Sequence, residues 1–395
     1  MKSNKALFPF DRPMAKQHEE IEGLLYGCSK DKFGGMYYTD NANKLHVAVL
    51  ENDEEIRKRV SAKDVEFHRV KYSWETMNEA QSAVERLFGS YGIHSASFEP
   101  ENNRICIGVD NANSSVIQDI IAEMAAMGFD DANMFYIARE ERPEGFKPLE
   151  ENVVQSFSMN KPSSIAETTT TTIMPGGMIQ VKDSAGTYHH LCSVNYGYVY
   201  NSNAYIVGAG HAGSSSYVGK DAYYIPPITG YPISSVPLNY NSANRVKIGV
   251  VALYRLGGNY DLHTIRITEN NLAFSHTAYN GCSISTIGGN ITQGAPLRIC
   301  GITTRYDADY EYGYCANAQV SLSAYGKTMT NLIQLDFGAN NGTSGGPIIT
   351  QDSDDSIRLV GLASVNGTST CYAMPVRYMI STYSLSELPE GSITV

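Results

Sequence analysis

Charged residues are scarce in this sequence, where Asp, Glu, Lys and Arg make up only 18% of 395 residues. The few Lys and Arg residues form no basic surface of the kind that nucleic acids require, so we expect no nucleic-acid partner. No apolar run reaches the roughly 20 residues of a membrane-spanning helix, and Met1–Pro13 lacks the apolar segment of a secretory signal. No Cys-x-x-Cys pair is present either, and we expect no metal site and no cofactor.

The net charge of −11 is distributed unevenly, which favours two domains. About two-thirds of the acidic residues precede Ile173, so the C-terminal part is nearly neutral. From Met178 onward, short apolar segments alternate with turns of Gly, Asn, Pro and Ser, a pattern typical of an antiparallel barrel or sandwich. A short helix is expected beyond Met379.

The acidic N-terminal part shows a repeated order of hairpin, helix and strand. Strands are predicted where apolar and polar residues alternate, and helices where apolar residues recur at helical spacing. The predicted elements are Gly34–Tyr38, Lys44–Leu50, Asn52–Arg59, Val65–Val70, Ser73–Phe88, Ile93–Phe98, Arg104–Val109, Ser114–Met127 and Asn133–Ile137. This order predicts one α+β sheet with helices on one face. The His and carboxylate residues here show no convergent spacing, so no catalytic role is expected.

These patterns predict a tail over residues 1–16, an α+β domain over 17–140, a linker over 141–172 and a β domain over 173–395. The linker ends in the run Thr168–Thr172, which cannot bury a core and should be extended and exposed. Exposed linkers are where chains are cut. We predict processing in or just before Ile173, and the alternative is a tether that is never cleaved.

The most specific motif is Gly342–Pro347, which reads Gly-Thr-Ser-Gly-Gly-Pro. Flanking glycines leave the hydroxyl of Ser344 uncrowded, but a serine is a useful nucleophile only beside a base that an acid orients. His211 follows an apolar strand, and Asp261 begins an alternating one. The order His, Asp, Ser is that of chymotrypsin-type enzymes, and the spacing suits a compact two-barrel protease.

With these motifs the chain resembles chymotrypsin-fold serine protease precursors of the streptogrisin and α-lytic type. Further resembling segments are Ile173–Gly177, Cys300–Thr304 with Cys315, and Gly361–Ser364. The resemblance implies a mainly β protease domain of two antiparallel β-barrels, preceded by an α+β pro-domain that acts as intramolecular chaperone and inhibitor. It also implies protein or peptide substrates and an extracellular location.

The resemblance assigns a role to each motif residue. Ser344 is the nucleophile, His211 the general base and acid, and Asp261 the residue that orients the imidazole. The backbone N–H groups of Gly342 and Ser344 form the oxyanion hole. Thr343 stands where the family usually has Asp, so activation by an ion pair with a new N-terminus is excluded. Activation should instead depend on displacing the pro-domain.

The resemblance also places the substrate contacts. Ser364, Val365 and Asn366 form the edge that pairs with the substrate backbone, and Gly338, Ala339 and Asn366 line the primary specificity pocket. No carboxylate falls where trypsin-like enzymes carry theirs, so we expect preference for an uncharged side chain.

The sequence contains seven Cys residues, which cannot all pair. The resemblance implies one disulfide, between Cys300 and Cys315. Cys192 and Cys371 also match family cysteines, but their partner positions hold Ala and Gly. The unpaired cysteines are expected to be buried as small apolar side chains.

Two alternatives to a self-processing endopeptidase are open at this stage. The first is a protease-fold binding protein that no longer cuts, which the loss of a triad residue would favour. The second is an active protease that keeps residues 17–140 as a permanent regulatory domain.

Overall fold

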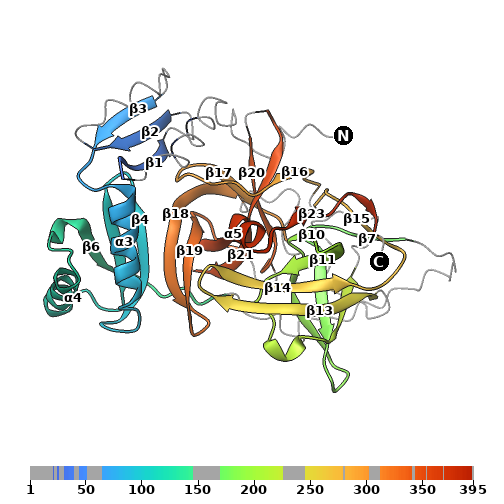
Figure 1. The fold of residues 1–395 in the computed structure, drawn as a ribbon. Helices are drawn as coiled ribbons and strands as arrows, with labels where there is room; N and C mark the ends of the chain where they lie inside the picture. Colours follow the sequence, from blue (N-terminus) through green and yellow to red (C-terminus); the bar gives the residue numbers. More distant parts are fainter. Residues whose placement is uncertain are drawn as a thin grey trace.

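The computed structural model shows a mainly β protein, as the sequence predicts (Figure 1). It describes residues 21, 25, 31–39, 44–50, 65–145, 170–225, 245–278, 281–301, 312–339, 343–352, 354–367 and 369–393. None of the helices in these ranges is both long and apolar enough to cross a lipid bilayer. The predicted tail, the predicted helix Asn52–Arg59 and most of the linker lie outside the described residues.

Within residues 31–145, the described residues show both predicted hairpins, the strand that follows each of them and the two predicted helices after Ser73 and Asn113. Helix α3 (Trp74–Glu85) begins after Ser73, whose hydroxyl accepts a hydrogen bond from the N–H three residues later. Asn113 caps helix α4 (Ser114–Ala126) in the same way. The strands are β1 (Phe33–Thr39), β2 (Lys44–Val49), β3 (Val65–Arg69), β4 (Ile93–Glu99), β5 (Arg104–Val109) and β6 (Phe135–Arg139).

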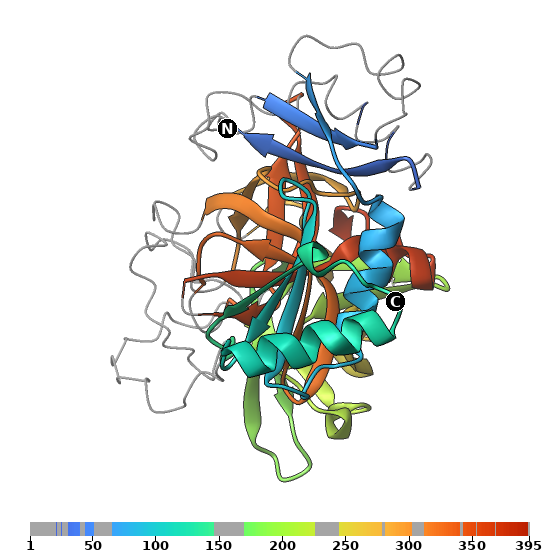
Figure 2. The same cartoon turned by 90° about the vertical axis from the view of Figure 1, so that its left-hand side faces the viewer.

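These six strands divide between two sheets, which corrects the single sheet expected from the sequence. In the first sheet β1 and β2 form a hairpin, and β3 lies parallel to β2. In the second, β4 and β5 form a hairpin, and β6 lies parallel to β5. The two sheets cannot merge along β4, because its other edge is paired with a strand from the C-terminal part. Figure 2 shows α3 and α4 in front of the second sheet.

The C-terminal part contains an eight-stranded antiparallel sheet with the order β23-β10-β11-β14-β13-β12-β8-β9. Apolar residues alternate along these strands, so they point to one face of the sheet. The apolar side chains on that face pack into one large core. Its strands are β8 (Met178–Lys182), β9 (Tyr188–Ser193), β10 (Tyr196–Tyr200), β11 (Asn203–Gly208), β12 (Asp221–Ile225), β13 (Val246–Gly257), β14 (Tyr260–Ile267) and β23 (Ser386–Glu387).

Six further strands close into a barrel, because the chain of pairings β17-β20-β21-β22-β19-β18 returns to β17. β16 (Ile284–Ile287) adds to β21 in parallel. Helix α5 (Val376–Tyr383) overlaps the helix expected beyond Met379 but begins before that residue. The barrel strands are β17 (Pro296–Ile299), β18 (Tyr312–Ala324), β19 (Lys327–Leu335), β20 (Pro347–Gln351), β21 (Ile357–Asn366) and β22 (Cys371–Pro375).

The end of the predicted linker joins a small sheet beside these two bodies. β7 (Thr171–Ile173) pairs in parallel with β15 (Leu272–Phe274), which also pairs with β24 (Gly391–Ser392). The side chain of Ile173 is fully buried, while Thr172 is extended and exposed. The predicted cleavage site therefore lies where an exposed chain enters an anchored strand.

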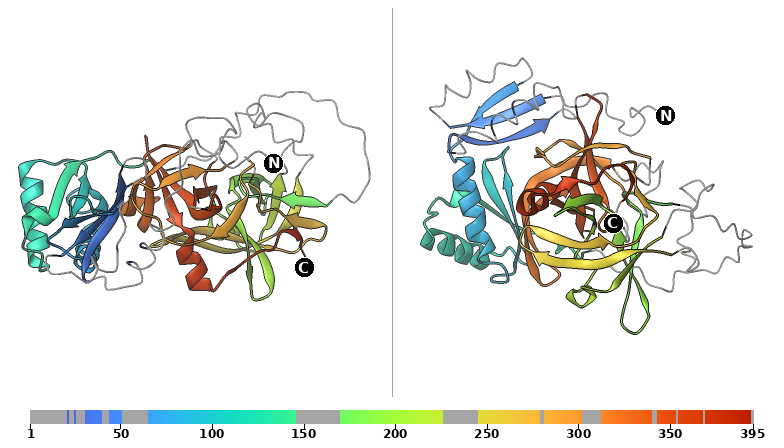
Figure 3. Two further views of the ribbon diagram at one scale, coloured as in Figure 1. Left: turned by 90° about the horizontal axis from the view of Figure 1, so that it is seen from above. Right: turned by 45° about the vertical axis from the view of Figure 1, so that its right-hand side comes forward.

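The N-terminal part is joined to the C-terminal barrel by main-chain pairing. Strand β18 closes the barrel on β17 with its first residues and pairs antiparallel with β4 further along, from Val320 to Leu322. The barrel sheet therefore continues without a break into β4, β5 and β6, as the views of Figure 3 show from two sides. The apolar core is also continuous, since Phe98 and Ile107 belong to the same buried cluster as Leu297 and Ile348.

A second, smaller contact links the first sheet to the barrel. The N–H of Tyr38 donates to the carbonyl of Gln293 over 2.8 Å, and Tyr37 forms an isolated bridge to the same residue. The neighbouring Gly294 has φ +83°, and a Cβ there would lie 2.5 Å from the Tyr38 carbonyl oxygen. Only glycine permits this approach.

Replacing Gly294 by Ala should loosen this contact. Both the left-handed backbone and the clash are unfavourable, so we expect a loss of roughly 2–4 kcal/mol in the free energy of unfolding. Gly219→Ala is the matched control, because Gly219 has the same φ of +83° with nothing within 4 Å of an added Cβ. This control variant should lose only about 1 kcal/mol in the free energy of unfolding. Urea unfolding of both variants in a Ser344→Ala background measures the difference, and equal losses would contradict it.

Candidate active site

His211 lies just beyond strand β11, close against strands β13 and β14. The approach depends on Gly210, where a Cβ would lie 2.6 Å from the carbonyl oxygen of Arg255 and 2.8 Å from the backbone nitrogen of Leu262. A side chain at residue 210 would push His211 away from β14, the strand that contains Asp261. The glycines around this histidine therefore have a packing role.

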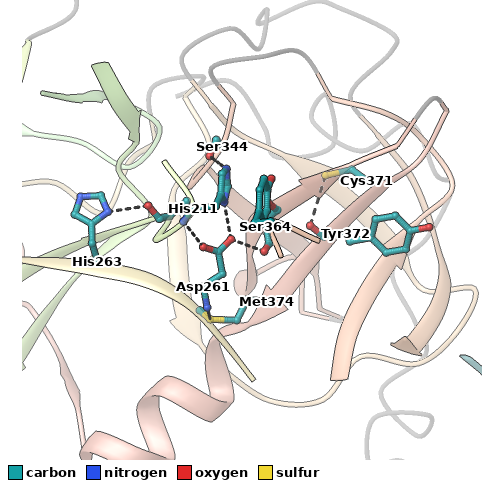
Figure 4. A network of polar contacts seen from close by, with 10 residues as sticks. His211, Asp261, His263, Ser344, Ser364, Cys371, Tyr372 and Met374 are labelled. Atoms are coloured by element: carbon teal, nitrogen blue, oxygen red, sulfur yellow. Dashed lines mark hydrogen bonds and ion pairs between the residues drawn. The ribbon is translucent and has the colours of Figure 1, made fainter. Parts of the chain in front are cut away.

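Asp261 is fully buried at the start of β14 and binds His211 twice. One carboxylate oxygen accepts from the backbone N–H of His211 and the other from ring Nδ1, each over 2.7 Å (Figure 4). A carboxylate can only accept, so Nδ1 carries the proton and Nε2 presents a lone pair. The hydroxyl of Ser344 donates to that Nε2 over 2.5 Å. The three residues singled out in the sequence thus meet in one continuous chain of hydrogen bonds.

Ser344 is fixed by its backbone. Its carbonyl accepts from the N–H of Ser193 over 2.7 Å, and Gly345 has φ +83° with a Cβ position 2.5 Å from the Ser193 carbonyl oxygen. The N–H of Gly346 donates to the carbonyl of Thr343 over 2.7 Å, which closes a tight turn around the serine. Thr343 is itself fully buried, in agreement with a structural role for this uncharged residue.

Two side chains that support Asp261 were not identified from the sequence. The hydroxyl of Ser364 donates to the carboxylate oxygen that also accepts from Nδ1 of His211, whereas the sequence predicts a role for the backbone of Ser364 alone. The N–H of Asp261 lies 3.2 Å from the sulfur of Met374. Neither residue belongs to a local motif with the triad, so no spacing in the sequence indicates these contacts.

His263 also lies beside the triad, and its environment makes it uncharged. It is buried in strand β14, and its Nδ1 donates to the carbonyl of Ala209 over 2.8 Å. Burial lowers the pKa of His263 to about 4 from an ordinary value of 6.5. A neutral ring here leaves Asp261 to act on His211 alone.

Tyr325 covers the imidazole of His211. It lies in the turn between β18 and β19 with φ +54°, and its ring is parallel to the imidazole to within 1° at a centroid distance of 4.5 Å. Its hydroxyl donates to the carbonyl of Ser364 over 2.9 Å. The side chain of His211 is 2% exposed, and Ser344 is 4% exposed.

The residues predicted to bind substrate lie at the end of β21 and in the segment after β19, and Asn366 joins the two. Asn366 and Ala339 exchange two hydrogen bonds, from Ala339 N–H to the Asn366 side-chain oxygen (3.1 Å) and from the Asn366 amide to the Ala339 carbonyl (2.7 Å). Gly338 directly precedes Ala339 in this hydrogen-bonded pair, and Val365 is fully buried in β21. The N–H of Gly145, at the exit of the N-terminal part, donates to the carbonyl of Asn366 over 2.9 Å. Gly342, the other predicted oxyanion-hole residue, lies outside the described residues.

The predicted disulfide between Cys300 and Cys315 is absent, because these two residues are not joined. The reason is the register of β17 on β18. Pro296 pairs with Tyr314, so Cys315 lies opposite Ala295, five residues along the chain from Cys300. That corresponds to a separation of about 16 Å along the strand, whereas a disulfide needs Cα atoms within about 7 Å. Cys192 and Cys371 are buried thiols, as expected.

The lowered pKa of His263 predicts a pH dependence of stability. As the pH falls, His263 is protonated in the unfolded chain before it is protonated in the folded chain. The contribution of neutral His263 to the free energy of unfolding is therefore fully present above pH 6.5 and is lost as the pH drops toward 4. The loss attributable to His263 is at most roughly 3 kcal/mol. Urea unfolding between pH 4 and 8 should show a smaller decline for His263→Asn than for the parent chain. Parallel curves for the two proteins would contradict a buried neutral histidine.

Comparison with known proteins finds likeness among solved structures alone, since no family model and no curated protein matches the sequence. The chain is similar to an "Alpha-lytic protease homolog N4" (TM-score 0.41, 19% identity, 54% of this chain and 98% of that chain). It is also similar to the Nocardiopsis protease NAPase (TM-score 0.36, 18% identity, 56% of this chain and 100% of that chain). A third similar structure is a glutamic-acid-specific serine protease (TM-score 0.39, 19% identity, 55% of this chain and 100% of that chain). Each of these bacterial serine proteases corresponds to about half of the present chain, at low identity.

Proposed function

We propose that the protein is a serine endopeptidase that hydrolyses peptide bonds through an acyl-enzyme. The observation that carries this proposal is the chain of hydrogen bonds from Ser344 through His211 to Asp261, at 2.5 and 2.7 Å. Ser344 attacks the peptide carbonyl, and Nε2 of His211 takes the hydroxyl proton and passes it to the leaving amine. Asp261 holds the imidazole in the required tautomer and stabilises its cation, and Ser364 fixes the carboxylate.

The oxyanion that forms on the attacked carbonyl needs backbone donors, for which we propose Gly342 and Ser344. The tight turn at Thr343–Gly346 supports this assignment, because it holds the backbone of the serine rigidly. Each such donor contributes a few kcal/mol to transition-state stabilisation. The hydrogen-bonded pair Ala339 and Asn366 forms one wall of the proposed specificity pocket. An uncharged substrate side chain fits the neutral lining of this wall.

We further propose that the described conformation is latent. The catalytic ring and hydroxyl are almost completely covered, and Tyr325 donates to the Ser364 carbonyl, a main-chain acceptor on the proposed substrate edge. Gly145 occupies a second acceptor on the same edge, the carbonyl of Asn366. The N-terminal part therefore acts as an inhibitor that also holds β18 in place, and removal of this part would open the edge. A cut in or just before Ile173 would leave that residue anchored in its sheet.

A fluorophosphonate probe tests the nucleophile. We expect labelling of the wild-type chain and none of Ser344→Ala, because the probe reacts only with an activated serine. Ser216→Ala, which removes an exposed serine of the short helix Ser215–Tyr217, should label like wild type. Labelling of Ser344→Ala at the wild-type level would remove the proposal, as would no labelling of any form.

Self-processing is tested by incubating the purified chain and sequencing the N-termini of its fragments. Wild type should produce a new N-terminus in or just before Ile173, and Ser344→Ala should stay intact. Full activity of an uncut chain would instead establish the N-terminal part as a permanent regulatory domain. A cut in both proteins would show that another protease is responsible.

Tyr325 provides a test of latency. Tyr325→Ala should raise the labelling rate of the full-length band about ten-fold in a short time course after cell-free synthesis, because stacking and one hydrogen bond are lost. Tyr325→Phe keeps the ring over His211 and should give an intermediate rate. If Tyr325→Ala labels no faster than wild type, the ring does not limit access.

A further inference from the structure

The first sheet of the N-terminal part brings together three side chains that the sequence keeps apart. His46 lies in β2, while Glu66 and His68 lie in β3, and no sequence motif connects them. Parallel pairing places His46 beside Glu66 and Ala48 beside His68. Side chains two residues apart on a strand share a face, so all three project from the same side of the sheet. Figures 1 and 2 show this sheet at one end of the molecule.

We propose that His46, Glu66 and His68 form a binding site for a divalent transition-metal ion, with zinc as the best fit. The three candidate ligand atoms all lie within 4.8 Å of one another. Nδ1 of His46 is 2.6 Å from Nε2 of His68, and one Glu66 oxygen is 3.6 Å from the first nitrogen and 4.0 Å from the second. These separations define a circle of radius about 2.0 Å, so a single point lies at zinc-ligand distance from all three atoms.

The surroundings of His46 orient it as a ligand. Its other ring nitrogen, Nε2, lies 2.7 Å from the hydroxyl oxygen of Thr39. When Nε2 donates to that oxygen, Nδ1 presents its lone pair toward the site, which is how metal-bound histidines are usually held. The side chain is 9% exposed, and its ring stacks on Tyr37 at a centroid distance of 4.7 Å with an interplanar angle of 4°. Rigid packing of this kind reduces the entropy lost on binding an ion.

Glu66 is also prepared for the role. Lys44 contacts one of its carboxylate oxygens, while the other faces the two imidazoles. The side chains of Glu66 and His68 are 47% and 43% exposed, which gives an ion a path from solvent and leaves room for a water as fourth ligand.

The donor set indicates which ion fits. Two imidazole nitrogens and one carboxylate oxygen suit zinc and its neighbours better than calcium or magnesium, which take mainly oxygen ligands. Tetrahedral coordination puts two zinc-bound nitrogens roughly 3.3 Å apart. The His46 and His68 rings therefore separate by about 0.7 Å when the ion replaces the proton between them. The half-exposed His68 is placed to make that movement.

Binding would have a structural consequence at a distance from the ion. His46 and His68 both stack on Tyr37, and Tyr37 and Tyr38 form the contact of β1 with Gln293 of the barrel. An ion that fixes the two imidazoles fixes the ring beside them. The site therefore stabilises the smaller of the two contacts between the N-terminal part and the barrel, and this inference does not depend on the catalytic proposal.

The test is a zinc titration of the full-length Ser344→Ala chain by calorimetry, after removal of metal with a chelator. We expect one ion per chain and a Kd at least ten-fold weaker for His46→Gln and for His68→Gln. His189→Gln is the matched control, because His189 pairs with the carboxylate of Asp183 but belongs to no group of three ligands among the described residues. It should bind zinc as the parent does. Cobalt should give visible bands of a nitrogen and oxygen site, without a thiolate band.

Three results would overturn the proposal. They are no saturable binding by the folded parent chain, equal affinity of the parent and His68→Gln, or a cobalt spectrum with a thiolate band. Circular dichroism without metal establishes that each variant is folded. If His46→Gln does not fold, Glu66→Gln and His68→Gln carry the test, because both residues are half-exposed and their loss leaves the core intact.

Discussion

The pairing of β4 with β18 determines where everything else in the molecule lies. β18 is too long to be used by the barrel alone, and beyond β17 it would present an unpaired edge with the apolar residues Val320 and Leu322. Unpaired edges of this kind invite aggregation and are normally covered. β4 supplies the missing neighbour, and side chains reinforce the joint: Gln81 donates to Ser321, and Asn317 donates to the carbonyl of Phe98 over 2.7 Å. The shared core then buries the helical side of the N-terminal part against the barrel.

The same pairing connects the N-terminal part to the candidate active site along two routes. The β18–β19 hairpin ends at Tyr325, so a partner that fixes β18 also fixes the ring over His211. The chain leaves β6 and reaches Gly145 within six residues, which brings its N–H to the carbonyl of Asn366. Glu140 anchors the start of this path, since its carboxylate accepts from Ser95 of β4 over 2.8 Å. Under the latency that we propose, loss of β4 would release both the ring over His211 and the neighbouring edge.

The sequence predicted the features that depend on neighbouring residues and missed those that depend on distant ones. Helix caps such as Ser73, the hairpins, and the motifs around His211, Asp261 and Ser344 each lie within a few residues. The structure joins the last three side chains by hydrogen bonds. The single N-terminal sheet was wrong because β4 pairs with β18, more than 200 residues away. The Cys300–Cys315 bridge was wrong because strand register, which spacing does not specify, places the two residues far apart. The Ser364 contact to Asp261, the stacking of Tyr325 and the cluster around His46 were invisible for the same reason.

Two contacts hold the N-terminal part on the barrel, and they differ in strength. We expect the weaker contact to break first. The joint at β18 combines a strand pairing with several side-chain hydrogen bonds, whereas the described main-chain contact of β1 beside the barrel is one isolated bridge and one hydrogen bond next to Gly294. Apolar side chains of both N-terminal sheets belong to the same core, so the difference lies in the hydrogen bonds. Local opening starts where the fewest buried contacts must be broken, so the first sheet separates from Gln293 before β4 leaves β18. A group that stiffens this sheet, as an ion at His46 does, acts on the first step of release. It slows opening without touching the hydrogen bonds of Ser344, His211 or Asp261, and so separates control of access from the chemistry itself.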